Sequence, residues 1–344
     1  MTEPSSRPLR RTTADMVAKR ANVSRVAVSR AFNPRASIRP DKRDLILRVA
    51  RELNYTPDMA ARSMVTGRSH LVAVIVPDLV SPWESQEVDA LTSALQDQGF
   101  ATLLFKTRAD MSLDETLLTY MGGFNPDSVI AFTETVRPQT LGRVLDRAVP
   151  IYVGYPESGA SVHAAPLSDR LNVLHRDGIV QAVALMQGFG ARRFAFLAGA
   201  SHSLATAQRL LAMRAVLAER GLPPPIVVQG DYSYDTAWRE TVNLFRIGEG
   251  ADAVFSANDV GAFGVIDALR HELGLRVPQD VKVVGFDDVA QAHWRAYDLT
   301  TIRIDIGERV GALVRLILRR LRTPDAGPLS ESVTARLVVR GTVG

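Results

Sequence analysis

Apolar runs of three to six residues, each about the length of one strand, recur along the chain from residue 71 onward. Longer segments with helical spacing, such as residues 88–98 and 209–220, lie between them. Strands that alternate with helices are typical of parallel sheets with helices on both faces. The runs form two sets of four, which predicts two similar α/β lobes. They are Leu71–Val76, Thr102–Phe105, Val129–Phe132 and Ile151–Val153, then Phe194–Leu197, Ile226–Val228, Ala253–Phe255 and Val281–Val284.

Before residue 70 the pattern changes to that of three short helices. Thr13 is placed to cap a first helix over residues 14–21, and Ser24 to cap a second. Asn22, between them, tolerates the left-handed conformation that a sharp turn needs. A third helix begins near Pro40, since proline is favoured at the first helical position. Three short helices with one tight turn predict a small all-α helix-turn-helix unit.

The second of these helices, which ends at Asn33 before Pro34, has two different faces. Val23, Val28 and Ala31 can face the other two helices. The positions on the other side, which are basic or polar apart from one valine, lie toward the amino-terminal end. This arrangement is typical of a recognition helix that enters the major groove, with its early residues at base edges. The exposed set is predicted to be Arg25, Val26, Ser29 and Arg30.

Charge supports a separate role for this leading segment. The formal net charge of the whole chain is +4, but residues 1–68 hold 15 Lys and Arg against 6 Asp and Glu, whereas residues 69–344 hold 26 against 31. A basic module on an acidic body indicates a polyanionic partner for the module. The chain has no cysteine, which excludes disulfides and thiolate metal sites. Its first residues lack the apolar core of a signal peptide, so we expect a cytoplasmic protein without a membrane span.

The chain resembles the LacI/GalR family of bacterial transcription regulators. The resemblance is carried by DMVAKRANVSRVAVSRAFN, ELNYTPDMAARSMVTGRS and LVAVIVPD, then by FSANDVGAFGVIDAL, VPQDVKVVGFDDV, LTTIRIDIGERV and LVVRGTVG. It implies a homodimeric regulator, of repressor type, that binds a near-palindromic DNA operator under the control of a small-molecule effector. By this resemblance the DNA-binding residues are Thr13, Ser24, Arg25, Val26, Ser29, Arg30, Asn33, Arg62 and Met64.

The resemblance also implies the division of the chain into domains. Residues 1–56 would form the DNA-binding head and residues 57–69 a hinge helix and linker, with Met64 in place of the leucine that usually enters the minor groove. An ordinary linker is the alternative for this segment. Residues 70–344 would form two lobes like those of periplasmic sugar-binding proteins. The expected bounds are about 70–160 and 296–325 for the first lobe, and about 161–295 and 326–344 for the second.

A ligand site is expected beyond the carboxyl ends of the strands, as in other open parallel sheets. Carboxylates, amides and an aromatic ring follow the strands there and suit a polyhydroxylated ligand. By the resemblance, the effector contacts would be Ser81, Trp83, Arg209, Tyr232, Asn258 and Asp287. Four of them have a structural alternative: Trp83 and Tyr232 could belong to the core, Arg209 to an exposed helix face, and Asn258 to a helix cap.

The family pattern also fails at two places that bear on the effector. Tyr155 and Pro156 stand where an acidic residue often follows the fourth strand, and Leu174 stands where the second lobe often has an aspartate. A simple hexose is therefore a weaker prediction than a sugar derivative that is more apolar or differently substituted.

Catalysis is not expected from the sequence. The six histidines are scattered, and the Asp287–Asp288 pair has no nucleophile beside it. We predict no catalytic residue, metal or cofactor. Two other functions remain open at this stage. One is a sugar sensor whose basic head does not bind DNA specifically. The other is a nucleoid-type protein with steep salt dependence and no base preference.

Overall fold

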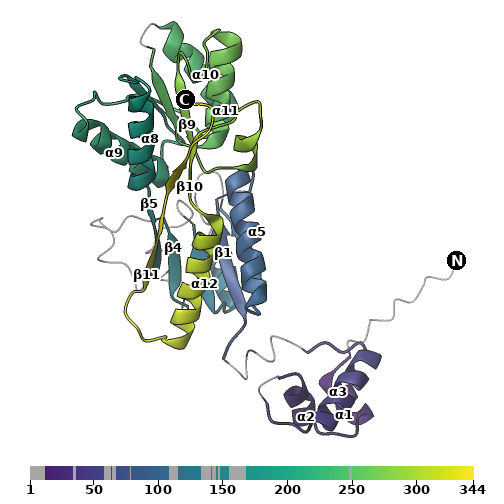
Figure 1. The fold of residues 1–344 in the computed structure, drawn as a ribbon. Helices are drawn as coiled ribbons and strands as arrows, with labels where there is room; N and C mark the ends of the chain where they lie inside the picture. Colours follow the sequence, from purple (N-terminus) through teal and green to yellow (C-terminus); the bar gives the residue numbers. More distant parts are fainter. Residues whose placement is uncertain are drawn as a thin grey trace, which may run out of the picture. The chain divides into compact units, whose positions relative to one another are not determined.

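The head consists of three helices, α1 (Ala14–Arg20), α2 (Arg25–Ala31) and α3 (Pro40–Glu52) (Figure 1). The predicted caps are confirmed: the Thr13 hydroxyl accepts from the Met16 amide and the Ser24 hydroxyl from the Ala27 amide. Asn22 has the left-handed φ of 51° that the turn between α1 and α2 requires. The three helices therefore form where the sequence predicts them.

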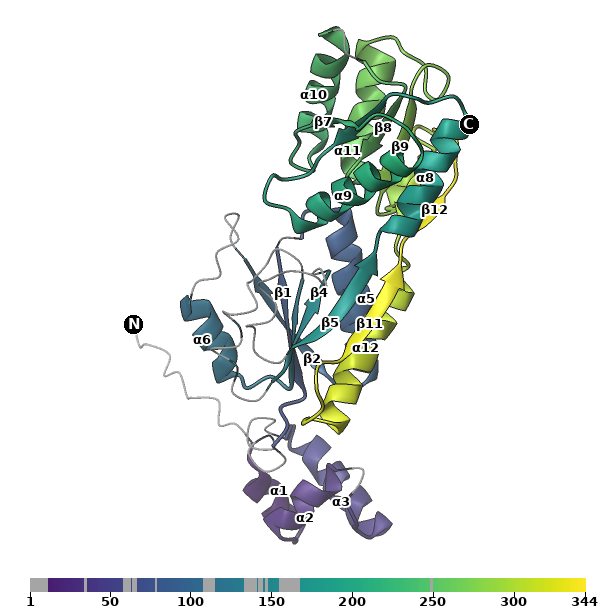
Figure 2. The ribbon, with the colours of Figure 1, turned by 90° about the vertical axis from the view of Figure 1, so that its left-hand side faces the viewer.

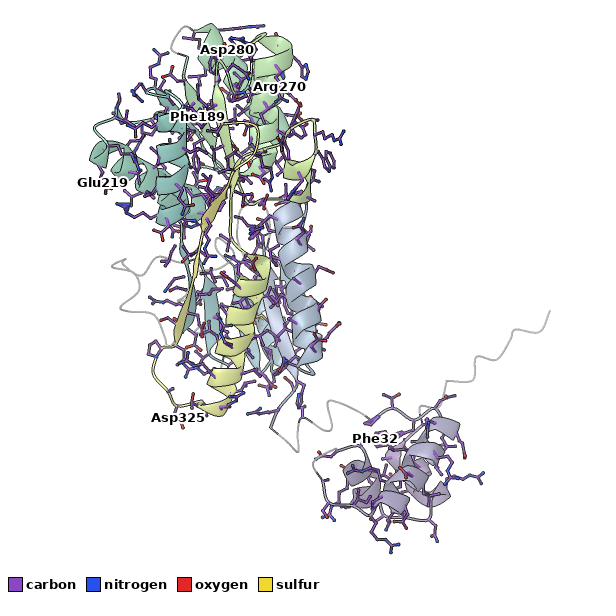
Figure 3. The ribbon with its side chains drawn as sticks, in the orientation of Figure 1. Phe32, Phe189, Glu219, Arg270, Asp280 and Asp325 are labelled. Carbon is purple, nitrogen blue, oxygen red and sulfur yellow. The ribbon has the colours of Figure 1, made fainter. Side chains whose placement is uncertain are left out.

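The core of the head is small and built from aliphatic side chains. Val17, Val28 and Ile46, one from each helix, are almost completely buried. Phe32, labelled in Figure 3, packs edge-on against Tyr55 with 5.7 Å between ring centroids. This contact joins the end of α2 to the segment after α3, so the head has its own core.

The computed structural model describes residues 12–33, 36–57, 63, 67–77, 79–107, 115–132, 141, 145, 148–154, 168–247 and 250–344. The chain divides into two compact units, residues 1–69 and 70–344. Arg62 and Met64 lie outside the described residues, as does most of the predicted hinge helix, so those predictions stay predictions. None of the helices in the described ranges is long and apolar enough to cross a membrane.

The first sheet of the second unit is parallel and has the strand order β11-β5-β4-β3-β1-β2. On one face of β1, Val72 and Val74 belong to the core that includes Leu91 and Leu313. On the other face, Ala73 and Ile75 pack against α6. The elements are β1 (Leu71–Val76), α5 (Pro82–Asp97), β2 (Ala101–Lys106), α6 (Glu115–Gly123), β3 (Ser128–Ala131), β4 (Pro150–Val153), β5 (Asp169–Leu174), α12 (Ile306–Arg322) and β11 (Ser330–Thr334).

The second sheet has the order β12-β10-β9-β8-β6-β7 and is parallel except for β12, which pairs antiparallel with β10. Its strands are β6 (Phe194–Leu197), β7 (Ile226–Val228), β8 (Ala253–Ser256), β9 (Lys282–Phe286), β10 (Thr301–Arg303) and β12 (Arg336–Val338). Its helices are α8 (Arg176–Gly188), α9 (Leu204–Glu219), α10 (Tyr234–Arg246) and α11 (Asp259–Asp267), followed by the π-helix Ala268–Glu272 and the 3-10 helix Ala290–His293. The predicted two-lobed α/β fold is confirmed.

The lobe boundaries differ from the expected ones at three strands. β5 and β11 belong to the first sheet, where they lie side by side (Figure 2), and β10 belongs to the second. The chain therefore passes between the lobes after β5, after β10 and after β11. β5 and β11 escaped prediction because their sequences, DRLNVL and SESVT, mix polar with apolar residues and form no apolar run. A buried pair anchors β5: the Arg320 guanidinium of α12 donates to both oxygens of Asp169, at 2.9 and 2.5 Å.

Candidate functional site

Helix α2 presents the four predicted side chains to solvent. Arg25, Val26, Ser29 and Arg30 are exposed, and Val26 is 61% exposed although it is apolar. Arg25 lies 4.0 Å from Asp15 on α1, a weak surface ion pair. The Arg30 guanidinium has no ion pair or hydrogen bond with the described residues. Within the described part of the chain, the helix thus offers one arginine without a protein partner and one exposed apolar side chain, Val26, beside it.

The other head residues of the predicted set have different environments. The hydroxyls of Thr13 and Ser24 are engaged as helix caps, which places them at the amino-terminal ends of α1 and α2. Asn33 is half-buried, and its backbone carbonyl accepts from the Arg43 guanidinium at 3.1 Å. Thr13 and Ser24 therefore act as helix caps in the head, and their contact with DNA stays a prediction.

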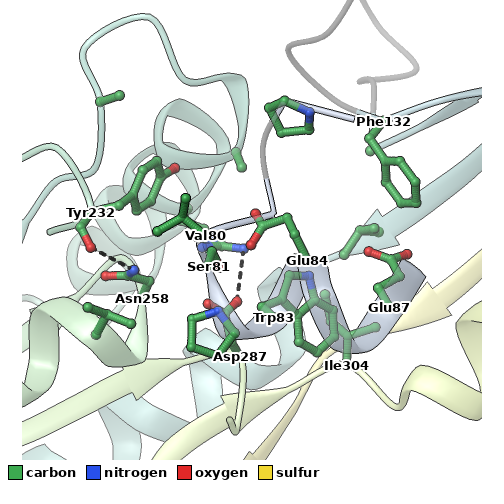
Figure 4. Close-up of a pocket in the computed structure, with 18 of the residues that line it drawn as sticks. Val80, Ser81, Trp83, Glu84, Glu87, Phe132, Tyr232, Asn258, Asp287 and Ile304 are labelled. Carbon is green, nitrogen blue, oxygen red and sulfur yellow. Dashed lines mark hydrogen bonds and ion pairs between the residues drawn. The ribbon is translucent and has the colours of Figure 1, made fainter. Parts of the chain in front are cut away.

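A cavity of about 680 Å³ lies in the unit formed by residues 70–344 (Figure 4). All six sequence-predicted effector residues line it: Ser81, Trp83, Arg209, Tyr232, Asn258 and Asp287. Asp287 follows β9, Asn258 follows β8, and Ser81 and Trp83 begin α5, so the carboxyl ends of the parallel strands meet at this cavity as expected. Its volume is within the range of about 300–1,000 Å³ that is typical of ligand pockets.

Arg209 and Asp287 form a buried polar pair in the cavity wall. The Arg209 Nη2 lies 3.9 Å from the Asp287 Oδ1, and the guanidinium stacks 3.6 Å from the centroid of the Phe286 ring. Arg209 also donates to the Ala257 carbonyl, but its buried Nε has no partner among the described residues. Burial raises the pKa of Asp287, and the nearby Arg209 opposes this effect. The exposed-helix alternative for Arg209 is therefore wrong, because the side chain is buried.

Asp287 has a φ of 120°, and Asp288 has a φ of 57°. Two consecutive residues other than glycine at positive φ store backbone strain, which is common at functional sites. The Asp288 carboxylate turns away to the Arg340 guanidinium at 2.5 Å, whereas Asp287 lines the cavity. Because of the strained turn, the Asp287 carboxyl group lies at the cavity and the Asp288 carboxylate lies against Arg340.

Tyr232 and Asn258 support each other at one side of the cavity. The Asn258 Nδ2 donates to the Tyr232 carbonyl at 3.0 Å, and its Oδ1 accepts from the Gly261 amide at 2.9 Å as the cap of α11. The Tyr232 hydroxyl lies 2.7 Å from the Thr206 hydroxyl. A Cβ added at Gly199 would meet the Tyr232 ring at 2.1 Å, so this glycine makes room for the ring. Asn258 therefore does cap a helix, and it lines the cavity as well.

Glu87, His175, Gln208 and Arg309 are among the residues of the cavity wall that sequence reasoning missed. Burial lowers the pKa of His175 to about 3, so its imidazole is neutral at physiological pH, and its Nδ1 has no hydrogen-bond partner among the described residues. A signal for Glu87 was present in the sequence. It lies in the buried stripe of α5 formed by Trp83, Leu91 and Leu95, where a carboxylate interrupts an apolar face.

A further buried carboxylate, Asp259, lies at the start of α11 and accepts from the Val289 amide at 2.9 Å and the Thr301 hydroxyl at 2.5 Å. Burial raises its pKa from 3.8 to about 7, although these hydrogen bonds oppose the rise. The folded protein thus holds this proton more tightly than the unfolded chain does. The stabilising effect is complete below pH 3.8 and is lost as the pH rises through about 7.

We therefore predict a pH-dependent difference in stability between the wild type and Asp259→Asn. The free energy of unfolding of the wild type, relative to that of the variant, should fall between pH 5 and pH 8, because only the wild type must ionise a buried carboxyl group. Urea unfolding at both pH values measures this difference. An equal difference at the two values would show that Asp259 does not titrate in this range.

Together, a helix-turn-helix head and a two-lobed ligand-binding unit define a ligand-responsive DNA-binding regulator. Residues 14–58 match the family of bacterial regulatory proteins of the lacI type, and residues 183–343 match a periplasmic binding protein-like domain. The HTH-type transcriptional regulator CelR of Thermobifida fusca is 30% identical over 339 residues, which cover 96% of this chain and 98% of that protein. The chain belongs to the LacI family of bacterial transcriptional regulators.

Other relatives and solved structures agree with this assignment. The ribose operon repressor of Halalkalibacterium halodurans is 24% identical over 96% of this chain and 97% of its own length. The lac repressor dimer bound to operator and the anti-inducer ONPF has a TM-score of 0.85 at 24% identity, covering 97% of this chain and 99% of that one. The complex of CelR with cellobiose has a TM-score of 0.69 at 27% identity, covering 96% and 100%.

Proposed function

We propose that this protein is a cytoplasmic, homodimeric repressor whose α2 helices enter two successive major grooves of a near-palindromic operator. Arg25, Val26, Ser29 and Arg30 would contact base edges or phosphates, and Thr13, Ser24 and Asn33 would hold the head against the backbone. Arg62 and Met64 would act in a hinge that meets the minor groove. Support comes from the solvent-exposed basic face of α2, which has no role in the core of the head.

The effector would bind in the cavity through Ser81, Trp83, Arg209, Tyr232, Asn258 and Asp287. The observation that carries this proposal is that six residues from five separate parts of the sequence line one cavity with a buried Arg–Asp pair and aromatic rings. Such a wall suits the hydroxyl groups and the C–H face of a carbohydrate. CelR, whose structure has been solved with cellobiose, and the ribose operon repressor are relatives that fit this proposal.

Effector binding would be coupled to DNA binding through the relative positions of the two lobes. Arg209, Tyr232, Asn258 and Asp287 come from the second lobe and Ser81 and Trp83 from the first, so a ligand that contacts both sets favours one interlobe angle. The coupling free energy must be reciprocal: an effector that weakens DNA binding is itself bound more weakly by the DNA complex.

The test is to mix the purified protein with sheared genomic DNA at near-physiological salt and to sequence the retained fragments. Retention of a few fragments that share a near-palindrome is expected. Adding the sugar that binds in the cavity should change the amount of these fragments that is retained. Uniform retention across the genome would instead support a nucleoid-type protein, and a sugar response without DNA retention would support a sensor.

A further inference from the structure

A hydrogen bond joins the two lobes directly in the wall of the cavity. The Gln208 Nε2 of α9, in the second lobe, donates at 3.1 Å to the Gly154 carbonyl, which follows β4 in the first lobe. Both residues line the cavity. Figure 2 shows α9 on the side of the second lobe that faces the first sheet. The lobes are therefore connected here by a side-chain contact, in addition to the three places where the chain itself passes between them.

The acceptor of this hydrogen bond is fixed by the first sheet. Gly154 follows the last residue of β4, and its amide donates to the Leu171 carbonyl of β5 at 2.9 Å. Its φ is 77°, a left-handed conformation that glycine adopts without strain. The carbonyl that Gln208 reaches therefore moves with the first lobe as a whole.

The donor is fixed equally well in the second lobe. Helix α9 begins after Ser203, whose hydroxyl accepts from the Thr206 amide at 3.1 Å. Arg209, the residue after Gln208, is buried, whereas Gln208 itself is half-buried. Because a change in the interlobe angle moves α9 relative to β4, a sufficiently large change breaks the hydrogen bond to Gly154.

Gln208 also contacts the chain at one of its passages between the lobes. His175 is the first residue after β5, and its side chain is hydrogen-bonded to that of Gln208. Burial, followed by the charges of Arg209 and Arg309, lowers the pKa of His175 to about 3, and the hydrogen bond with Gln208 opposes this shift. A hydrogen bond that raises the pKa of a histidine is one that the imidazole donates. The Gln208 oxygen therefore accepts from His175 while its nitrogen donates to Gly154.

The energetic effect of such a contact falls on the equilibrium between interlobe angles. A hydrogen bond that forms at one angle, and is replaced by hydrogen bonds to water at another, favours the first angle. The usual net strength of a neutral hydrogen bond corresponds to a change of about two- to tenfold in the ratio of the two populations. Coupling between two sites of an allosteric protein is typically about 5–150-fold, so a contact of this size is a measurable part of it.

We propose that Gln208 is an interlobe latch, a positioning residue whose hydrogen bond to the Gly154 carbonyl holds the lobes of the effector-free protein at the angle of this structure. The inference rests on the proposed function, in which the interlobe angle controls operator affinity. Because the latch lies in the cavity wall, a ligand group that donates to the Gly154 carbonyl replaces it. Without the latch, the lobes of the empty protein adopt other angles more often.

The first experiment measures the distance between the lobes in the full-length, effector-free protein. The chain has no cysteine, so Arg322→Cys on α12 and Ala215→Cys on α9 place one spin label on an exposed position of each lobe. Co-expression with an excess of the cysteine-free chain leaves at most one labelled chain in most dimers, so double electron–electron resonance reports the distance within one chain. Gln208→Met keeps the length of the side chain but cannot donate, and it should broaden this distance distribution and shift its mean.

Two further variants separate the latch from a general effect on packing. Gln208→Glu keeps an acceptor for His175 but has no amide donor for Gly154, so it should broaden the distribution as Gln208→Met does. Gln187→Met is the matched control, because it removes another half-buried glutamine, whose Oε1 accepts from Arg220 at 3.0 Å within the second lobe. This control should have the wild-type distribution. A wild-type distribution in both Gln208 variants would overturn the latch.

Operator affinity without effector, measured by fluorescence anisotropy with an enriched operator fragment, relates the latch to regulation. Gln208→Met should change this affinity by about two- to tenfold, and Gln187→Met should leave it unchanged. A broadened distance distribution with wild-type operator affinity supports the latch and contradicts the proposed coupling between the lobes and DNA. An unchanged distribution contradicts the latch alone, even where the protein binds its operator specifically.

Discussion

Replacing Arg30 by alanine is expected to lower operator affinity by about 1–3 kcal/mol at each half-site, the usual contribution of a good arginine contact to a base. A symmetric dimer loses this contribution twice, so the total loss reaches about 2–6 kcal/mol, more than tenfold in affinity. The reason is structural: Arg30 is exposed on α2 and has no protein partner among the described residues, so it is available to DNA. Fluorescence anisotropy with an enriched operator measures the loss.

Two controls make this result specific to the recognition helix. Arg51→Ala removes an exposed arginine from α3 and should change operator affinity much less. Effector affinity of Arg30→Ala should equal that of the wild type. The salt dependence identifies the kind of contact: loss of two phosphate contacts lowers the slope of log affinity against log salt by about 2, whereas loss of base contacts relaxes sequence preference instead. Wild-type operator affinity in Arg30→Ala would remove this residue from the interface.

The helices of the head could be predicted from sequence because their signals are local. Ser24 caps α2, Asn22 takes the turn conformation, and Val28 faces inward, each through contacts within a few residues of the chain. The apolar strands of the two sheets were also predictable, since most of them, such as β1 and β3, are buried on both faces. β5 and β11 were not, because a polar strand is fixed by its partners: Asp169 needs Arg320, which is 151 residues away.

The residues of the cavity show the same difference between local signals, which the sequence reveals, and contacts between distant residues, which it does not. The edge of each sheet that holds the ligand-facing side chains can be inferred from the carboxyl ends of the predicted parallel strands. Arg209 and Tyr232, which no local pattern marks, came from the resemblance to a family. Glu87 interrupts the apolar face of α5, which marks it as unusual, but its role and that of Arg309 could not be inferred because the role of a charged residue on a buried helix face depends on its partner. Their pairing depends on the packing of α5 against α12, which joins residues 222 positions apart.

Replacing Asp287 by asparagine is expected to weaken effector binding by about 1.5–3 kcal/mol, roughly ten- to a hundredfold, the value of a hydrogen bond to a charged group. Asparagine keeps the shape of the side chain and tolerates positive φ better than alanine, so it isolates the charge at this strained position. Arg209 keeps its contacts with Ala257 and Phe286, so the variant should remain folded. Operator binding without effector should be unchanged.

The pH dependence of effector binding gives this prediction a second, independent measurement. Because burial raises the pKa of Asp287, the empty site holds a proton to a higher pH than an ordinary carboxyl group does. Hydroxyl groups that donate to the carboxylate favour its ionised form, so effector binding releases that proton and wild-type affinity rises with pH. Asp287→Asn should lose this rise, whereas Asp235→Asn, an exposed change at the start of α10, should keep it. Titration calorimetry in buffers of different ionisation enthalpy counts the proton, and equal proton release by the wild type and Asp287→Asn would show that another group binds the effector hydroxyls.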